Sequence, residues 1–545
     1  MIRLQAGEGK RYALAIVAGM MWAAAFPKIG VAGLAWIAPG LMLAAAIGAK
    51  GGAPFRIGYV AGLTHFLASL YWLLWIPVTG LPIGGWLALS AFLALYPATW
   101  VWLCWRMYPV RLEEERTVSA LMDRFLAPSW AQRLWWGLGC AALWVSWEMA
   151  QARVLSGFPW NFLGASQYQM LPLIEVASVT GVYGVSFMMV WFSAALLGTQ
   201  AMLLRRPEQR SRWLAELIVP LVVVAAVAWF GFRQLFHPKP ERPTLKMALV
   251  QPSIPQKWIW DAAESSRRFE QLLQLSRRAL TNHPDVLVWP EAAVPYMVRY
   301  DEEVHAAVTN LVRTHHTWIV LGSDDVEVRG RSTGEQETNV FNSAFLVSPE
   351  GKFAPGYRKR RLVIFGEYYP LKRWLPFLDG LGEFTPGDRV VPFHLAELGV
   401  KTAVLICFED VFPHLVREYV DEDTDFLLNL TNNGWFGESA AQWQHAANAV
   451  FRAVENGLPL VRCANNGLTC WVDEQGRMNE VYFPDTRDVY GAGFKIAQVP
   501  LLAGARRAPT FYRGHGDWFG WGCVGLAALG AGLNRAGRKR TGVFT

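Results

Sequence analysis

The sequence predicts a polytopic α-helical membrane protein with about eight transmembrane helices and one extracytoplasmic α/β domain. Three observations predict this fold class. The composition is apolar, because 53% of the 545 residues are hydrophobic, 17% are charged and 27 are tryptophan, which is not typical of a soluble enzyme. Long apolar runs flank one polar segment, and basic residues are distributed unevenly around these runs.

Eight apolar runs are long enough to cross the ~30 Å hydrocarbon core of a membrane as helices. They cover residues 11–26, 31–49, 57–77, 84–105, 134–150, 178–199, 214–232 and 518–533. We therefore predict a transmembrane domain over residues 1–235 and a C-terminal transmembrane helix over 517–534. The polar domain is predicted between them, over residues 243–507.

The basic residues predict the orientation of these helices, since Lys and Arg are enriched in cytoplasmic loops. The short loops on one side of the predicted spans hold only Lys28 and Arg153. The other side holds eighteen basic residues: Arg3, Lys10, Arg11, Lys50, Arg56, Arg106, Arg111, Arg116, Arg124, Arg133, Arg205, Arg206, Arg210, Arg212, Arg535, Arg538, Lys539 and Arg540. We therefore expect both termini in the cytoplasm and the polar domain on the extracytoplasmic side.

Three ionisable residues lie in or near the ends of predicted spans. An ionisable group inside a membrane is a candidate functional residue, but Glu148 and Glu216 are close to the ends of their runs. We expect both at the membrane interface. His65 falls inside the third run, and we expect it to be a hydrogen-bonded histidine of the helix bundle.

The polar segment alternates short apolar runs with helical periods, which predicts a layered α/β domain. Predicted strands cover residues 246–251, 286–289, 318–322, 340–347, 402–406, 426–430 and 459–463. Predicted helices cover residues 262–280, 302–313, 412–419 and 442–455. The sequence has no dinucleotide motif, P-loop, HExxH motif or CxxC pair, so we expect no cofactor and no metal.

Three chemically useful residues stand at or near ends of predicted strands. Glu291 completes a Trp-Pro-Glu tripeptide, Lys359 lies in a basic segment, and Cys407 stands between a strand and a helix. Helix N–H groups beside such a thiol lower its pKa, which suits a nucleophile. A carboxylate accepts its proton and a lysine stabilises an oxyanion. Taken singly, the three motifs are ordinary structural features: a turn, a solvated charged face and a buried thiol.

Taken together, the three motifs resemble the carbon-nitrogen hydrolase (nitrilase) superfamily, whose αββα sandwich carries a Glu-Lys-Cys triad in this order. With its membrane spans, the chain resembles the apolipoprotein N-acyltransferase family, bacterial enzymes that add the third acyl chain to lipoproteins. The resemblance implies that Glu291 in WPE is the general base and Lys359 in YRKRRLV the oxyanion lysine. It implies that Cys407 in ICFED is the nucleophile.

The resemblance also implies supporting residues. Glu367 in FGE matches a further essential glutamate, and Glu409 matches an acid that supports the site. Trp260, or alternatively Trp258, is expected on a mobile loop over the cleft, with Trp435 at the cleft's flank. Residues 432–437 and 462–467 match two further Asn-containing stretches of the family.

The chain departs from the family pattern at three positions. Ile364 stands where Pro is usual, Phe408 where Tyr is common, and Asn433 where Asp is frequent. Phe408 has no hydroxyl, so it cannot make the hydrogen bond that a tyrosine hydroxyl would make from that position. Cys463 and Cys470 lie on predicted strands, and we expect them to be structural residues of the domain core.

The implied reaction transfers an acyl chain from a phospholipid to Cys407 as a thioester. The chain then passes to the α-amino group of the S-diacylglyceryl cysteine of an apolipoprotein. We expect a monomer in the bacterial inner membrane, with the phospholipid donor, the apolipoprotein acceptor and the bilayer as its partners and no nucleic acid. One alternative is a membrane-tethered nitrilase-type amidase, which would not need eight spans. A second is a transporter or scaffold, but the inverted repeats and broken helices typical of transporters are lacking.

Overall fold

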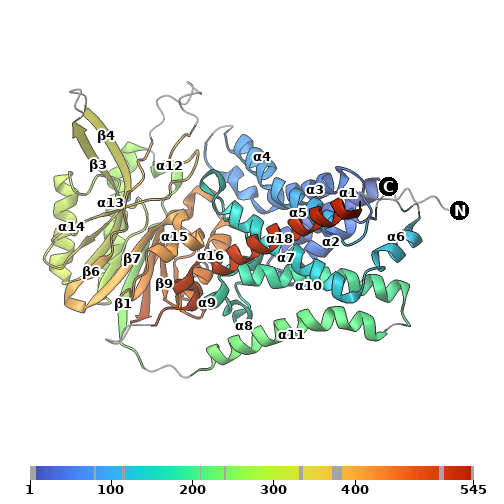
Figure 1. Ribbon diagram of the computed structural model, residues 1–545. Helices are drawn as coiled ribbons and strands as arrows, with labels where there is room; N and C mark the ends of the chain where they lie inside the picture. The colour runs from blue at the N-terminus through green and yellow to red at the C-terminus, as the bar shows by residue number, and fades with distance from the viewer. Residues whose placement is uncertain are drawn as a thin grey trace. The chain divides into compact units, whose positions relative to one another are not determined.

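The computed structural model of the chain (Figure 1) consists of two compact units. The helical unit comprises Met1–His237 and His515–Thr545, and the α/β unit comprises Pro238–Gly514. The described residues are 8–78, 81–112, 115, 117–208, 210–237, 241–259, 261–330, 336–370, 383–501 and 508–541. The domain boundaries that we predict, residues 1–235, 243–507 and 517–534, stay predictions.

In the helical unit, all eight predicted runs are helical over most of their length. Its α-helices are α1 (Glu8–Ala24), α2 (Ala38–Ala46), α3 (Ala53–Ser69), α4 (Leu81–Leu93), α5 (Leu95–Arg106), α6 (Val118–Phe125), α7 (Trp130–Gln151), α8 (Leu171–Ile174), α9 (Ala177–Thr180), α10 (Val182–Arg205), α11 (Arg210–Leu235) and α18 (Trp518–Thr541). Short 3₁₀ turns cover Ala32–Trp36, Tyr71–Trp75, Val154–Ser156 and Leu163–Gln167.

Among the described residues, three helical segments are long and apolar enough to cross a membrane: Leu81–Arg106, Val182–Arg205 and Leu214–Leu235. Other predicted runs are interrupted. The run 31–49 divides at Ile37 into a 3₁₀ turn and α2, and the run 57–77 leaves the α-helix after Ser69. The apolar composition of a run does not predict where its helix is interrupted, because such breaks depend on local backbone geometry.

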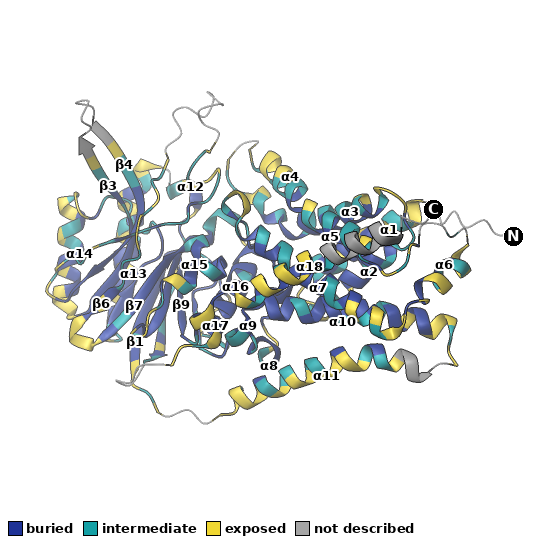
Figure 2. Ribbon diagram, viewed as in Figure 1, coloured by how far each residue is buried: buried dark blue, intermediate teal, exposed yellow. Residues whose placement is uncertain are grey.

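Helix α11 exposes apolar side chains along much of its length (Figure 2). Val222, Trp229 and Phe232 are 60%, 62% and 49% exposed. Exposure of so long an apolar surface to water is unfavourable in free energy, whereas its exposure to the hydrocarbon of a bilayer is not. The exposure of α11 is therefore typical of a lipid-facing helix.

The three ionisable residues that we noted in the predicted spans, His65, Glu148 and Glu216, are buried in the helical unit. Arg133 on α7 donates from Nε to Glu216 Oε1 of α11 at 2.8 Å. His65 stacks on Trp22 with the ring centroids 3.6 Å apart, and neither of its ring nitrogens has a hydrogen-bond partner among the described residues. Our expectation of a hydrogen-bonded His65 is therefore wrong, because Trp22, Phe26 and Phe66 surround the ring.

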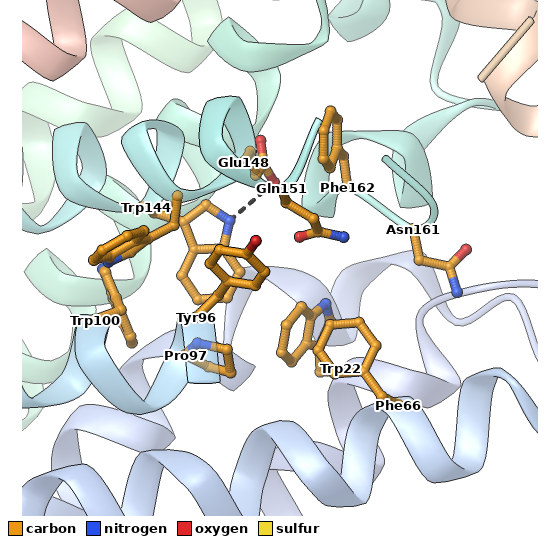
Figure 3. Close-up of a pocket in the computed structure, with 11 residues that line it drawn as sticks. Trp22, Phe66, Tyr96, Pro97, Trp100, Trp144, Glu148, Gln151, Asn161 and Phe162 are labelled. Atoms are coloured by element: carbon orange, nitrogen blue, oxygen red, sulfur yellow. Dashed lines mark hydrogen bonds between the residues drawn. The ribbon is translucent and has the colours of Figure 1, made fainter. Parts of the chain in front are cut away.

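Glu148 lies at a narrow cavity of the helical unit that has about 330 Å³ of unfilled space (Figure 3). The carboxylate is 4% exposed. Its Oε1 accepts from Trp144 Nε1 and the Leu163 amide at 2.9 Å each and from Ser186 Oγ at 3.0 Å. The lining is mostly aromatic: Trp22, Phe66, Tyr96, Trp100, Trp144, Trp147 and Phe162. Glu148 is therefore an interior residue of the unit and does not lie on its surface.

The α/β unit contains two six-stranded sheets. The first has the order β12-β1-β2-β3-β4-β5 and the second has the order β11-β10-β9-β8-β7-β6. The strands are β1 (Thr244–Gln251), β2 (Val286–Val288), β3 (Trp318–Gly330), β4 (Gln336–Val347), β5 (Tyr357–Arg358), β6 (Phe393–Leu395), β7 (Val400–Ile406), β8 (Phe426–Thr431), β9 (Leu460–Ala464), β10 (Cys470–Val472), β11 (Met478–Asn479) and β12 (Gly493–Pro500). All seven predicted strands are present, and β3, which runs to Gly330, is much longer than predicted.

Helices α12 (Gln256–Ile259), α13 (Ser265–Leu280), α14 (Glu302–His315), α15 (Pro413–Glu418), α16 (Ala441–Asn456) and α17 (Phe511–His515) complete this unit. Leu272, Leu275 and Ala279 share one face of α13 and belong to the core between α13, α14 and the first sheet. Between the two sheets, Cys463 Sγ of β9 lies 3.3 Å from the Val250 carbonyl oxygen of β1. The arrangement is therefore a two-sheet sandwich with outer helices.

Several chemically useful residues follow the carboxyl ends of parallel strands. β1, β2 and β3 are parallel to one another, as are β7, β8 and β9. Glu291 follows β2, Cys407 follows β7, and Asn432 follows β8. The carboxyl ends of neighbouring parallel strands meet at the same edge of a sheet.

Candidate active site

Glu291 occupies a loop that presses closely against β3. A Cβ on Gly322 would lie 2.4 Å from the Pro290 carbonyl oxygen and 2.8 Å from Glu291 Cα, so only glycine permits this approach. The Glu291 side chain is 7% exposed. Its Oε2 accepts from the amide of Asn432 at 2.8 Å, which joins the ends of β2 and β8.

Lys359 directly follows β5 and is 1% exposed. Its backbone continues the pairing with β4, since its amide donates to the Asn342 carbonyl at 2.9 Å. Its Nζ donates to Glu367 Oε1 at 2.8 Å and to Glu291 Oε1 at 3.2 Å. Burial acts to lower the pKa of Lys359, but the carboxylates of Glu367 and Glu291 raise it well above its ordinary value. Lys359 is therefore a permanent cation between two carboxylates.

Asn342 of β4 joins the same two glutamates and was not predicted from the sequence. Its Nδ2 donates to Glu291 Oε1 at 2.9 Å and to Glu367 Oε1 at 3.0 Å. The second oxygen of Glu367 accepts from the Val363 amide at 2.8 Å. The structure thus brings Glu291, Lys359 and Glu367 together around one asparagine.

Cys407 is the first residue after β7 and has φ = 53°. A left-handed conformation is strained in a residue with a Cβ, and such strain is frequent at functional sites. The Cys407 carbonyl accepts from Asn429 Nδ2 at 3.0 Å and lies 3.2 Å from His445 Nε2. These contacts fix the backbone of the turn and leave the thiol half-buried.

The thiol of Cys407 is neutral at rest. Burial and then the Glu291 carboxylate raise the pKa of Cys407 to about 12, although Lys359 opposes this shift. Our expectation of a lowered pKa is therefore wrong, because desolvation and a neighbouring negative charge outweigh the helix N–H groups. The thiol of Cys407 is therefore within electrostatic range of Glu291 and Lys359.

Glu409 is fully buried and accepts hydrogen bonds from five residues. Its carboxylate accepts from the phenols of Tyr357 and Tyr419 and from the amides of Arg360, Arg361 and Ile406, with the shortest distance to each between 2.7 and 3.2 Å. Three donors come from the segment around Lys359, one from the end of β7 and one from Tyr419, which follows α15. Glu409 therefore holds the turn of Cys407 and the loop of Lys359 in fixed positions.

Asp410, His445 and Arg462 form a second buried group behind Cys407. His445 Nε2 lies 2.6 Å from Asp410 Oδ1, and Arg462 pairs with the other Asp410 oxygen. His445 Nδ1 lies 3.0 Å from Asn433 Oδ1. Burial acts to raise the pKa of Asp410, but His445 and Arg462 lower it below its ordinary value. His445 has no motif in the sequence that would have identified it.

The two Asn-containing stretches join neighbouring loops. Asn465 Nδ2 donates to the Ile254 carbonyl at 2.8 Å and to Asn432 Oδ1 at 3.0 Å. Asn432 Nδ2 donates to Gln256 Oε1 at 3.0 Å. These bonds attach the beginning of α12 to the end of β8.

The predicted aromatic residues have different positions. Trp260 lies outside the described residues, whereas Trp258 is half-buried in α12 with the Arg267 guanidinium 4.5 Å from its ring centroid. Phe408 is half-buried and packs edge-on against Phe412, with the centroids 5.0 Å apart. Trp435 is half-buried in a 3₁₀ turn, Asn433–Phe436. Their predicted roles at the cleft stay predictions.

Two family models match the chain. Carbon-nitrogen hydrolase matches residues 246–489, and the apolipoprotein N-acyltransferase N-terminal domain matches residues 18–195. Over 48% of its length the chain is also similar to an amidase of the nitrilase superfamily from Nesterenkonia AN1, at 17% identity, a TM-score of 0.36 and 92% coverage of that chain.

Relatives match across both units. The chain is 34% identical to an apolipoprotein N-acyltransferase of Geobacter metallireducens over 96% of this chain and 95% of the relative. It is 30% identical to an apolipoprotein N-acyltransferase of Vibrio cholerae over 87% of each. The chain therefore belongs to the apolipoprotein N-acyltransferase family.

Proposed function

We propose that this protein transfers an acyl chain from a phospholipid to the N-terminal cysteine of a diacylglyceryl-modified apolipoprotein, with Cys407 as nucleophile. The observation that carries the proposal is the cluster of Glu291, Lys359 and Cys407 in a family of acyltransferases. Each residue has one task. Glu291 accepts and returns a proton, Lys359 stabilises the oxyanion, and Cys407 carries the acyl group.

The first half-reaction forms the thioester. Glu291 takes the proton of the neutral thiol as the sulfur attacks the ester carbonyl of the phospholipid. Lys359 and a backbone N–H near Phe408 stabilise the negative oxygen of the tetrahedral intermediate. Collapse of the intermediate returns the proton to the leaving alcohol, which departs as a lysophospholipid.

The second half-reaction forms the amide. The α-amino group of the apolipoprotein attacks the thioester carbonyl, and Glu291 passes a proton from this nitrogen to the sulfur of Cys407. Both substrates are lipid-anchored, so a site beside the bilayer raises their effective concentration. Exclusion of water from the thioester favours transfer over hydrolysis.

We place this protein in the bacterial inner membrane as a monomer with about eight spans, both termini in the cytoplasm and the α/β unit outside. The asymmetric distribution of Lys and Arg supports this orientation. The apolar exposure of α11 supports contact with lipid. A membrane-tethered amidase would use the same triad, but its product would be a free acid instead of an N-acylated lipoprotein.

The test uses the full-length protein in detergent with a phospholipid that carries an isotopically labelled acyl chain. Peptide mapping by mass spectrometry should find the labelled acyl group on Cys407 in the wild type. The Cys463→Ala variant is the matched control, since Cys463 is a buried cysteine of the same unit. A labelled Cys463, or labelling that persists in Cys407→Ala, contradicts the proposal.

A further inference from the structure

Asp324 lies on the face of the first sheet that carries the active-site cluster. It is directly opposite Asn342 in the antiparallel pairing of β3 with β4. Directly opposite residues in such a pair project their side chains from the same face. Asp324 therefore projects beside the amide of Asn342. The negative charges of Glu291 and Glu367 act on its carboxyl group.

Asp325 provides a contrast, because adjacent residues of a strand project to opposite faces. Its carboxylate pairs with Arg358 at 3.1 Å and with Arg299 at 3.5 Å. Asp325 is thus compensated by two arginines on the other face. Within the described part of the chain, Asp324 forms no ion pair with a basic side chain.

The charges around Asp324 do not balance. Among the described residues that act on this site, the carboxylates of Asp324, Glu291 and Glu367 face a single cation, Lys359. Burial, followed by the charges of Glu291 and Glu367, raises the pKa of Asp324 to about 6. The site therefore favours an added cation, and Asp324 has the proton affinity of a base that works near neutral pH.

A separate observation indicates that this site suits a ligand that carries hydrogen-bond donors. Asn342 is 5% exposed, and its Oδ1 has no donor among the described residues. The amide cannot be reversed, because its Nδ2 already donates to both Glu291 and Glu367, and a reversed amide would place an oxygen against two carboxylates. A buried acceptor without a partner is costly. A ligand with N–H groups would remove this cost.

We propose that Asp324 and Asn342 Oδ1 bind the protonated α-amino group of the apolipoprotein and that Asp324 removes its first proton. The inference rests on the proposed function. It identifies the acceptor subsite of the same site and concerns the second half-reaction alone. An ammonium group has three donors, so it can contact Asp324 and Asn342 Oδ1 before it attacks the thioester.

The proton balance requires such a base. An α-amino group has a pKa of about 8, so at neutral pH it enters mainly as an ammonium, which has no electron pair for attack. Asp324 takes one proton from the ammonium and releases it to water. The neutral amine forms the C–N bond, Glu291 moves the second proton to the sulfur, and the C–S bond breaks. The products are the amide, the Cys407 thiol and one free proton.

The test follows the two half-reactions separately in full-length Asp324→Asn protein. Thioester formation from a labelled phospholipid should match the wild type. Transfer to a synthetic diacylglyceryl-cysteine peptide at pH 7 should fall by about 10²-fold. Hydroxylamine, a neutral nucleophile at pH 7, should cleave the thioester of both proteins at equal rates. Glu303→Gln is the control for loss of an exposed carboxylate in the same unit.

The pH dependence gives an independent readout. Wild-type transfer should decrease as pH falls through about 6, because protonated Asp324 no longer accepts a proton. The ratio of the wild-type transfer rate to that of Asp324→Asn should be smaller above pH 8, where the amine is already neutral. The charged groups that act on the pKa of Asp324 are Glu291 from the loop after β2 and Glu367 from the loop after β5. The Asp324→Glu variant should restore part of the transfer rate, because it restores the carboxylate.

Three outcomes of these experiments would overturn the inference. Equal transfer rates for Asp324→Asn and the wild type overturn the inference. They would indicate that residue 324 is only a structural partner of Asn342, a role that asparagine fills as well as aspartate. Loss of thioester formation in Asp324→Asn also overturns it, because the residue would then act in the first half-reaction. Absence of a thioester in the wild type contradicts the proposed function itself, and the inference fails with it.

Discussion

Two buried carboxylate clusters of the α/β unit differ in how completely they are satisfied. Glu409 accepts from two phenols and three backbone amides. Glu291 and Glu367 each accept one backbone amide, but they share a single lysine and a single asparagine, and Asp324 adds a further charge beside them. Buried polar groups normally have partners. The Glu409 cluster therefore holds the loops in place. The cluster of Glu291, Glu367 and Asp324 has more negative charges than cations, so it is suited to bind a ligand and to transfer protons.

The largest effect should follow from a change of the nucleophile itself. Cys407→Ser places a far less acidic hydroxyl beside Glu291, so acyl transfer should fall by about 10⁴-fold or more. The measurement is the rate of N-acylation of a diacylglyceryl peptide, with circular dichroism to check the fold. Normal turnover by the serine variant would show that Cys407 is not the nucleophile.

Glu291→Gln should reduce thioester formation by about 10²- to 10⁴-fold, because an amide does not accept the thiol proton. The same change removes a charge that raises the pKa of Cys407, so this pKa should move below about 12. The variant should therefore hold more thiolate at pH 9 and yet be less active. Ultraviolet thiolate absorbance, with Cys407→Ala subtracted, measures the shift. An unchanged pKa would mean that the two side chains do not interact.

Glu409→Gln tests the satisfied cluster. The amide nitrogen would face donors, which leaves buried groups unpaired at a cost of about 1–3 kcal/mol in the free energy of unfolding. Activity should follow the folded fraction in a thermal or denaturant titration. A large loss of activity in fully folded protein would assign Glu409 a role in the chemistry and would remove the distinction between the two clusters.

Cys463→Ala should have a smaller effect, with a stability cost of about 1–2 kcal/mol and no chemical defect. Cys463 is fully buried between the sheets, where it lies near the carbonyls of Val250 and Val288. Cys470 is also buried, on β10, and should behave alike. A folded Cys463→Ala protein that forms no thioester would contradict the assignment of Cys407.

Trp260→Ala should have the least effect on stability if Trp260 covers the cleft, because a lid residue is not part of a core. Truncation of a core aromatic costs about 3–5 kcal/mol. Melting temperature and transfer rate are measured together, with Trp258→Ala as the matched variant. A large loss of melting temperature, with activity in proportion to the folded fraction, would refute the lid.

The sequence allowed most elements of the α/β unit to be predicted, because their apolar periodicity is local. β3 was predicted to end at Gly322, but its pairing with β4 continues to Gly330, since backbone hydrogen bonds do not require apolar side chains. β12 was missed because it pairs with β1, which lies far away in the chain. Long-range pairing leaves little local signal.

The site was predictable only in part for the same reason. Glu291, Lys359 and Cys407 stand in short recognisable motifs. Asn342 lies 51 residues from Glu291 and 25 from Glu367, inside a strand whose pattern indicates only burial. The raised pKa of Cys407 depends on desolvation and on a charge more than a hundred residues away, neither of which can be seen in the segment ICFED.

The most direct test of the division between the clusters is a single-turnover measurement of the acyl adduct on Cys407. Wild type, Glu291→Gln and Glu409→Gln are mixed with labelled phospholipid and quenched at intervals, and the adduct is quantified by mass spectrometry. We predict rapid labelling of the wild type, almost none in Glu291→Gln, and labelling in proportion to the folded fraction in Glu409→Gln. Equal adducts on the wild type and Glu291→Gln would contradict the account.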